Sequence, residues 1–296
     1  MTAGGADSVD VREVGPRDGL QAEAPIAVED RVRLIAALFD AGVRHVEACS
    51  FVSPKAVPSM AGAAEVVSAL RPPADARVVA LVPNLRGAEL AGDAGVRELS
   101  VTISASPAYN EKNVRMSVDE SVESIAAIAK LGMPVDAVVS CAFGSPYEGD
   151  IAVAAVAELG RRLLDVGAAT LTLADTTGMA TPRRVEEVLA ATGTDVGLHL
   201  HETRGTGLVN AYAAWQAGVR RFDTSVGGLG GSPFAAGAAG NLATEDLVHL
   251  LDDLGVVTGI DLDRLLAASG LVASLVGHAV PSRVAGAGPR TRLAPA

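Results

Sequence analysis

The sequence predicts a single (β/α)8 barrel, a TIM-barrel fold, and three features of the chain lead to this fold class. Short apolar runs typical of strands alternate with stretches that carry apolar residues at helical spacing, in a unit of roughly 30–40 residues. Several helical stretches end in a glycine just before the next strand, as at Gly42 and Gly95. The chain has 296 residues, a length that suits one α/β barrel.

Eight strands are expected, followed by an additional helical segment. The strands are predicted at residues 9–14, 43–49, 77–82, 96–103, 135–141, 170–174, 196–201 and 220–225. An open doubly wound sheet is the structural alternative, but it would carry a glycine-rich phosphate loop after its first strand. Here the glycine-rich run, residues 227–231, follows the last strand instead. The absence of a phosphate loop after the first strand disfavours the open sheet, and a closed barrel accommodates all eight predicted strands.

The whole chain, residues 1–296, is expected to form one catalytic domain. Its core spans about residues 9–277, because the predicted helix at 262–276 can pack on the barrel. Residues 286–296 are rich in glycine, proline and arginine, which predicts a flexible tail.

Composition limits the function classes. Hydrophobic residues make up 49% of the chain and aromatic residues 3%, so the core must be aliphatic. The net charge of −11 argues against a nucleic-acid or anionic-membrane partner. No apolar run reaches the length of a membrane span, and the start of the chain lacks a signal-peptide pattern. Cys49 and Cys141 lie in apolar runs and are expected to be buried free thiols in a cytoplasmic protein.

A pair of histidines ends the seventh predicted strand. His199 and His201 point to the same side, because side chains alternate along a strand. Asp18 follows the first strand and Asn241 follows the eighth, and in this fold functional residues gather at the strand ends. A carboxylate, an amide and two imidazoles suit Mg²⁺, Mn²⁺ or Zn²⁺. The alternatives are a polar strand end for the histidines, and helix capping by Asp18 and by Asn241 before Leu242.

Arg17 adjoins the predicted ligand Asp18. A guanidinium beside a metal suits an oxyanion that forms during a reaction. An ion pair between Arg17 and Glu47 is the structural alternative, and the two interpretations are compatible. Because they are neighbours in the chain, Arg17 and Asp18 are expected to project in different directions.

Several longer motifs then resemble a known family, 3-hydroxy-3-methylglutaryl-CoA lyase. They are Val-Gly-Pro-Arg-Asp-Gly-Leu-Gln at 14–21, Ser-Phe-Val-Ser-Pro-Lys at 50–55, Ser-Cys-Ala-Phe-Gly-Ser-Pro-Tyr-Glu-Gly at 140–149, and the segments 227–233 and 240–246. The resemblance runs over about residues 9–277 and includes the His-x-His pair.

The resemblance implies a metal-dependent enzyme that cleaves an acyl-CoA. A divalent ion would be held by Asp18, His199, His201 and Asn241, and Arg17 would stabilise an enolate. A CoA thioester would be cleaved to acetyl-CoA and a ketone or keto acid such as acetoacetate, and a homodimer or higher homo-oligomer is expected. The resemblance also implies acidic residues that support the site, namely Glu47, Asp175 and Glu245. His199 or Asp18 would act as the base. CoA would be contacted by Lys55, Lys112 and Asn113, with Arg115 nearby.

One departure from the family pattern bears on catalysis. The family carries a cysteine that donates a proton in its glycine loop, and here this position is Ser232. A serine hydroxyl is a weaker acid than a thiol near neutral pH. Slower turnover, another proton donor, or a different 3-hydroxy acid substrate are therefore expected alternatives. Arg204, which stands where animal lyases have tyrosine, also points to a different substrate; a Claisen-type synthase and an impaired acyl-CoA-binding barrel are the remaining alternatives.

Overall fold

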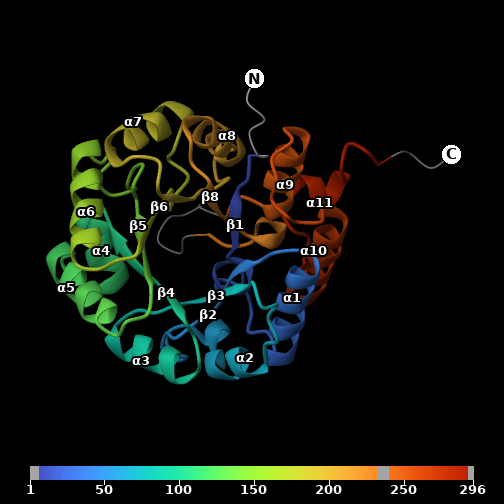
Figure 1. Cartoon of the computed structure of the whole chain (residues 1–296), viewed down its shortest axis with the longest axis horizontal. Coiled ribbons are helices and arrows are strands. Elements are labelled where there is room, and N and C mark those ends of the chain that lie inside the picture. The colour runs from blue at the N-terminus through green and yellow to red at the C-terminus, as the bar shows by residue number, and fades with distance from the viewer. Residues whose placement is uncertain (1–6, 232–239, 293–296) are drawn as a thin grey trace.

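The computed structural model describes residues 7–231 and 240–292, and its eight parallel strands close into a barrel in chain order. This confirms the predicted fold class, and Figure 1 shows the strands surrounded by a ring of helices. The strands are β1 (Asp10–Glu13), β2 (His45–Ser50), β3 (Arg77–Leu81), β4 (Glu98–Ser104), β5 (Val135–Ser140), β6 (Thr170–Ala174), β7 (Gly197–His199) and β8 (Arg221–Thr224). Each overlaps a predicted strand.

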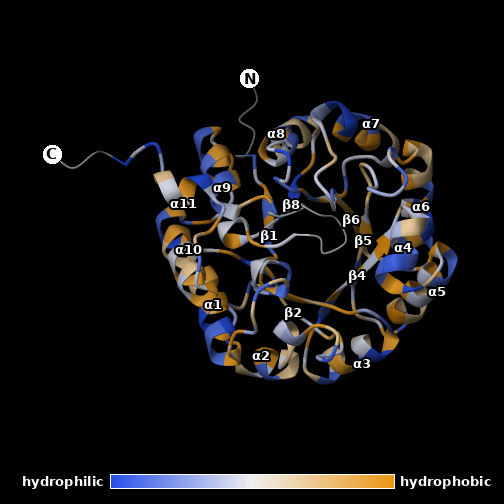
Figure 2. Cartoon of the chain, turned by 180° about the vertical axis from the view of Figure 1, so that it is seen from behind, coloured by the Kyte–Doolittle hydropathy of each residue, from blue (hydrophilic) through white to orange (hydrophobic). Residues whose placement is uncertain are grey.

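Helices follow the strands and cover the outside of the barrel. They are α1 (Val28–Asp40), α2 (Ala63–Ala69), α3 (Leu85–Asp93), α4 (Pro107–Val114), α5 (Val118–Ala129), α6 (Val153–Asp165), α7 (Pro182–Thr192), α8 (Gly207–Ala217), α9 (Thr244–Asp253), α10 (Leu262–Val276) and α11 (Arg283–Ala287). Three short helical turns are η1 (Gly15–Gly19), η2 (Pro58–Met60) and η3 (Val226–Gly228). In Figure 2 the outer helices carry both hydrophobic and hydrophilic residues, as amphipathic helices on a barrel do.

The additional C-terminal helix α10 has the predicted bounds. It lies against α1, and the Asp261 amide before it donates to the Ala41 carbonyl after α1 at 2.7 Å. The tail prediction is wrong for residues 286–287, which belong to α11. Ser282 caps that helix through the Ala285 amide at 3.0 Å, and its hydroxyl donates to Asp246 at 2.9 Å. These contacts tie α11 to α9, a long-range effect that local composition does not reveal.

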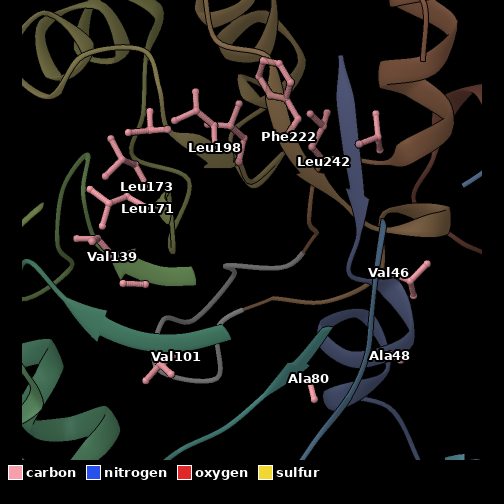
Figure 3. Packing of buried hydrophobic residues seen from close by; sticks show 14 of the residues in the cluster. Val46, Ala48, Ala80, Val101, Val139, Leu171, Leu173, Leu198, Phe222 and Leu242 are labelled. Atoms are coloured by element: carbon pink, nitrogen blue, oxygen red, sulfur yellow. The ribbon is translucent and has the colours of Figure 1, made fainter. Parts of the chain in front are cut away.

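Apolar side chains pack between the strands and the helices. On β6, β7 and β8 the alternating residues Leu171, Leu173, Leu198 and Phe222 are buried in one hydrophobic cluster, and Figure 3 shows them around the barrel wall. Cys49 and Cys141 are buried and free, as predicted. Within the described ranges, no helix is long and apolar enough to cross a membrane. The core that supports the site therefore lies outside the strands.

The interior of the barrel is polar instead. Arg12 on β1 donates to Asp136 on β5 at 2.7 Å, and these two strands stand opposite each other in the closed sheet. The contact must therefore cross the barrel interior. Thr172 on β6 donates to the same Asp136 carboxylate at 2.8 Å. Barrels of this fold usually fill the interior with branched apolar residues, so this buried polar network is a departure from the common pattern.

Candidate active site

A tight turn directly after β1 positions Arg17 and Asp18. The amides of both residues donate to the Val14 carbonyl, Arg17 at 3.1 Å and Asp18 at 2.7 Å, and the turn η1 has π-helical geometry. The sequence permitted a helix cap at Asp18, but its side chain lies within this turn and does not cap a helix. Because η1 follows the carboxyl end of β1, Asp18 stands at the end of the barrel where active sites lie.

The chain brings Asn241 beside the histidine pair by inserting residues 241–243 between the segments that follow β7 and β8. Asn241 forms an antiparallel bridge with His201, and the Leu242 amide donates to the Leu200 carbonyl at 2.9 Å. Helix α9 begins only at Thr244, so Asn241 does not cap a helix at Leu242 as the alternative interpretation required. The Asn241 amide group instead donates to Asp18 Oδ2 at 2.8 Å and to the Leu229 carbonyl at 2.9 Å.

The four predicted ligands lie together at the mouth of the barrel. His199 Nε2 is 3.1 Å from His201 Nε2 and 3.9 Å from Asp18 Oδ2. Two ligand nitrogens about 2.1 Å from one ion would stand about 3 Å apart at a right angle. The imidazole pair already has this separation. Asn241 Oδ1 is buried without a hydrogen-bond partner among the described residues, as a ligand oxygen awaiting a cation would be.

The Asp18 carboxylate is not yet at the distance from the two imidazoles that a shared ion requires. Across residues 7–231 and 240–292, no group of three or more His, Cys, Asp or Glu side chains has the geometry of a finished metal site. Asp18 Oδ1 accepts from Arg17 Nη1 at 2.6 Å while its Oδ2 accepts from Asn241. A movement of roughly 1 Å would bring Asp18 to the spacing expected between ligands of one ion. Metal binding by these four residues stays a prediction.

Burial and neighbouring charges set the protonation of these groups. Burial raises the pKa of the Asp18 carboxyl, but the Arg17 and His199 charges outweigh this and hold it below the ordinary value. Burial and the charge of His199 lower the pKa of His201 to about 3, so His201 is neutral near pH 7. The pKa of His199 is lowered by burial and raised more by its hydrogen bond with Asp223, with a net rise. An anionic carboxylate and a neutral imidazole suit cation binding.

Arg17 is held between two carboxylates. Its Nε donates to Glu47 Oε2 in a very short contact, and its Nη1 donates to Asp18. The ion pair with Glu47 was expected, but the expectation that Arg17 and Asp18 project apart is wrong, because the long Arg17 side chain reaches Asp18 Oδ1 at 2.6 Å. Glu47 is 1% exposed, and its other oxygen accepts from Ser100 Oγ on β4. Arg17 is thereby fixed in one orientation beside the candidate ligands.

Acidic residues implied as supports surround this centre. Asp175 Oδ1 accepts the Met179 and Ala180 amides at 2.7 and 3.0 Å, while its buried Oδ2 lacks a described partner, and burial raises its pKa to about 6. Glu245 accepts the Gly227 amide at 2.9 Å, and burial raises its pKa to about 7. Both carboxyls therefore brace loops at the barrel mouth, Asp175 after β6 and Glu245 after β8.

The residues proposed to contact CoA lie farther out. Lys55 is exposed in the loop after β2, and Lys112 and Asn113 are exposed on α4, which follows β4. These positions are at the same end of the barrel as Asp18. Lys112 Nζ lies 5.0 Å from the centre of the Tyr147 ring, a cation–π distance. Their role in CoA binding stays a prediction, and Ser232 lies outside the described residues.

The buried charged residues beneath the candidate site were not identified from the sequence. Arg12, Asp136 and Asp223 lie inside the barrel, and Asp223 Oδ2 is 3.3 Å from His199 Nδ1. A signal was present, because polar residues recur at every second position of two strands, as at Arg221 and Asp223. These runs were interpreted as apolar strands with functional residues only at their ends. The polar layer below the site was therefore not predicted.

Comparison with known proteins agrees with this architecture. A family model described as HMGL-like matches residues 8–272. The (R)-citramalyl-CoA lyase of Chloroflexus aurantiacus is 43% identical over 305 residues, covering 96% of this chain and 96% of that protein. The hydroxymethylglutaryl-CoA lyase of Pseudomonas mevalonii is 41% identical, covering 93% of this chain and 95% of that protein.

A solved structure has nearly the same shape. The structure of an HMG-CoA lyase from Acinetobacter baumannii in complex with coenzyme A and 3-methylmalate superposes with a TM-score of 0.94. It is 42% identical and covers 100% of both chains. The motifs noted in the sequence, the closed barrel and these relatives lead to one assignment. The chain belongs to the HMGL-like family, and it is a carbon–carbon lyase.

Proposed function

We propose that the chain cleaves 3-hydroxy-3-methylglutaryl-CoA to acetyl-CoA and acetoacetate with the help of a divalent metal ion. The observation that carries this proposal is the convergence of Asp18, His199, His201 and Asn241 at the barrel mouth. The relatives named hydroxymethylglutaryl-CoA lyase support the substrate. The orphaned Asn241 Oδ1 and the spacing of the two imidazole nitrogens support the metal.

Mg²⁺ or Mn²⁺ is the cofactor we propose, with Zn²⁺ as the alternative. Oxygen donors from Asp18 and Asn241 and nitrogen donors from the histidines suit these ions. A bound ion would polarise the substrate oxygens and lower the pKa of the tertiary hydroxyl. A shift of the Asp18 carboxylate toward the imidazoles would loosen its ion pair with Arg17, and Arg17 would keep its ion pair with Glu47.

The residues then divide the reaction between them. A base takes the proton of the tertiary hydroxyl, and the electron pair of that bond forms the ketone. The base is Asp18 through an oxygen that does not hold the ion, or His199 when its Nε2 is not occupied by the ion. The carbon–carbon bond to the thioester methylene breaks, and its electrons become the enolate of acetyl-CoA. Arg17 is fixed where its positive charge can stabilise this enolate oxygen. A proton delivered to the methylene carbon, from the loop that carries Ser232 or from water, completes acetyl-CoA.

A second substrate is favoured by one residue. Arg204 donates from Nη1 to the Thr177 and Gly178 carbonyls at 2.6 and 2.9 Å, and its charge reaches Asp175. Because the chain is strongly acidic overall, a guanidinium at the rim suits a substrate carboxylate. Citramalyl-CoA, the substrate in the name of one relative, carries its carboxylate directly on the hydroxyl-bearing carbon. The distance between the substrate carboxylate and Arg204 would therefore differ between citramalyl-CoA and 3-hydroxy-3-methylglutaryl-CoA.

The test is acetyl-CoA release from each thioester by the purified protein with Mn²⁺. We expect 3-hydroxy-3-methylglutaryl-CoA to be used with a kcat/KM at least about tenfold above that for (R)-citramalyl-CoA, and the reverse order would establish the second substrate. Asp18→Ala should lose at least about a hundredfold in kcat, because a ligand is removed. Asp30→Ala, which alters only an exposed ion pair on α1, is the control. Full activity of Asp18→Ala would overturn the proposal.

A further inference from the structure

A buried network inside the barrel reaches the candidate site from below. Arg12 Nε and Nη2 donate to the two carboxylate oxygens of Asp223 at 2.8 and 2.7 Å. Its third nitrogen, Nη1, donates to Asp136 Oδ2 at 2.7 Å. Arg12 and Asp223 are 5% and 6% exposed, so the bidentate pair is nearly free of solvent. Such a two-point contact fixes the plane of the carboxylate as well as its position.

Strand register places this pair directly beside His199. Arg12 on β1 is opposite Asp223 on β8, and Asp223 is opposite His199 on β7. The three side chains therefore stand at one level on three adjacent strands of the closed barrel, of which β8 and β1 are labelled in Figure 1. Asp223 Oδ2, the oxygen that also accepts from Arg12 Nη2, is 3.3 Å from His199 Nδ1.

This contact determines which nitrogen of His199 carries the proton. Asp223 is held as a carboxylate by two N–H donors of Arg12, so it can only accept a hydrogen bond. His199 Nδ1 must then be the protonated nitrogen. When the ring is neutral, its Nε2, which faces His201 Nε2 and Asp18, therefore carries the lone pair. The other tautomer would set a nitrogen lone pair against the carboxylate.

We infer that Arg12 and Asp223 are positioning residues, which fix the tautomer and orientation of His199 so that Nε2 is presented to the site. A carboxylate behind a ligating histidine is a recurrent means of orienting the ring and raising its basicity. Here an arginine from the opposite side of the carboxylate fixes that orienting group in turn. The inference rests on the proposed function only in the identity of the ion that Nε2 would bind. The tautomer of His199 can be measured in the protein without metal.

The charges of the network indicate more than a structural role. One arginine faces two carboxylates, and Asp136 also accepts from Thr170 and Thr172 at 2.7 and 2.8 Å. A buried ion cluster adds little stability over well-packed apolar residues. Asp223 Oδ2 nevertheless stays in contact with His199 Nδ1, and its negative charge there favours a cation at Nε2.

The first experiment is Asp223→Asn, with Asp136→Asn as the matched control. Both remove one carboxylate from Arg12, but only Asp223 touches His199. In the metal-free protein with ¹⁵N-labelled histidine, NMR should show wild-type His199 protonated at Nδ1, and Asp223→Asn should shift it toward the Nε2-protonated form. Mn²⁺ affinity should fall by about 10–100-fold in Asp223→Asn. Asp136→Asn should change neither. An unchanged tautomer in folded Asp223→Asn would overturn the inference.

A second variant covers the possibility that Asp223→Asn does not fold. Arg12→Lys keeps the charge but cannot hold both oxygens of Asp223 and reach Asp136 together. We expect a mixture of His199 tautomers and a weaker Mn²⁺ affinity, with a lower kcat and an unchanged KM for the thioester. Wild-type tautomer and affinity in Arg12→Lys would contradict the inference. If wild-type protein binds no Mn²⁺, the metal proposal fails while the tautomer measurement still decides this one.

Discussion

Arg17 is held in a fixed orientation by its neighbours, and this orientation determines its role. Glu47 and Asp18 each accept one of its N–H groups, and Ser100 holds Glu47 from the other side. Arg17 is 9% exposed, so its charge acts through little water. A group fixed in this way needs no rearrangement when negative charge develops on a substrate oxygen, which is the condition for strong electrostatic catalysis.

Replacement of Arg17 by lysine tests this preorganisation. Arg17→Lys keeps a positive charge but cannot bond Glu47 and Asp18 with the same fork of donors. We expect kcat to fall by about 10²–10³ with little change in KM, because the lost stabilisation belongs to the transition state. Steady-state kinetics of acetyl-CoA release measure both constants. A rise in KM at constant kcat would instead assign Arg17 to substrate binding.

Ser232 calls for a separate prediction, made from its chemistry and its place in the sequence motif. A free thiol has a pKa of about 8.5, far below that of a serine hydroxyl, and exchanges protons more readily near neutral pH. Ser232→Cys should therefore raise kcat, and Ser232→Ala should leave it close to the wild-type value if water supplies the proton. Comparison of the three proteins at pH 7 and 8 measures the effect. A fall in kcat for Ser232→Cys would show that the serine itself is suited to the native substrate.

Among the elements, the glycine-rich loop after β8 is shaped to approach the candidate ligands. Gly230 has a φ of +108°, and a Cβ there would lie 2.5 Å from Asn241 Nδ2 and 3.2 Å from the Asp18 carbonyl oxygen. The Gly240 amide donates to the Gly230 carbonyl at 2.6 Å, so the loop and the 240–243 segment are joined at this point. Only a residue without a side chain allows this close approach.

The element-scale prediction is the effect of a methyl group at Gly230. Gly230→Ala should displace the Asn241 side chain and lower Mn²⁺ affinity at least about tenfold, in addition to the backbone strain of about 1 kcal/mol. Gly132→Ala is the matched control, because Gly132 also has a positive φ, +82°, but has nothing within 4 Å of a Cβ. Calorimetric titration with Mn²⁺ measures the difference. Equal affinities in the two variants would contradict this account of the loop.

The elements themselves could be predicted well from the sequence, but their contacts less so. The strand at 196–201 was predicted from its apolar start, and His199 and His201 were assigned to one side by alternation. The position of Asn241 opposite His201 depends on the chain returning to the barrel mouth, where Asn241 pairs with His201 after β7 and Ala243 pairs with Ser225 after β8. No local pattern encodes that return, so the sequence alone left helix capping open for Asn241.

For the molecule as a whole, the polar barrel interior is what sequence analysis did not anticipate. The repeat of strands and helices predicts the closed barrel, because it depends on local periodicity. The Arg12–Asp136 contact joins residues on opposite strands, separated by 124 positions in the chain. Alternation can identify such residues as facing inward, but only the closed sheet shows which partner each one meets.

Buried carboxyls make the stability of the whole fold depend on pH. Burial raises the pKa of Glu13 to about 8, although the Gly15 and Val226 amides and Thr244 donate to its carboxylate. Since the folded-state pKa exceeds the unfolded one, this contribution is complete below about pH 4.5 and is lost as pH rises through 8.

We therefore predict that Glu13→Gln weakens the loss of stability between pH 6 and pH 9. The amide keeps the shape of the side chain, accepts the two backbone amides and donates to Thr244, but does not ionise. Urea unfolding at the two pH values should show a free energy of unfolding that falls less in the variant, by at least about 1 kcal/mol. A parallel fall in both proteins would assign the pH dependence to other groups.

The central claim is that a divalent ion at Asp18, His199, His201 and Asn241 is required for carbon–carbon cleavage. The most direct test is acetyl-CoA release from 3-hydroxy-3-methylglutaryl-CoA by protein stripped with a chelator, before and after Mn²⁺ is restored. The account predicts a loss of at least about a hundredfold on stripping and recovery on addition of Mn²⁺. Undiminished release by the stripped protein would contradict it.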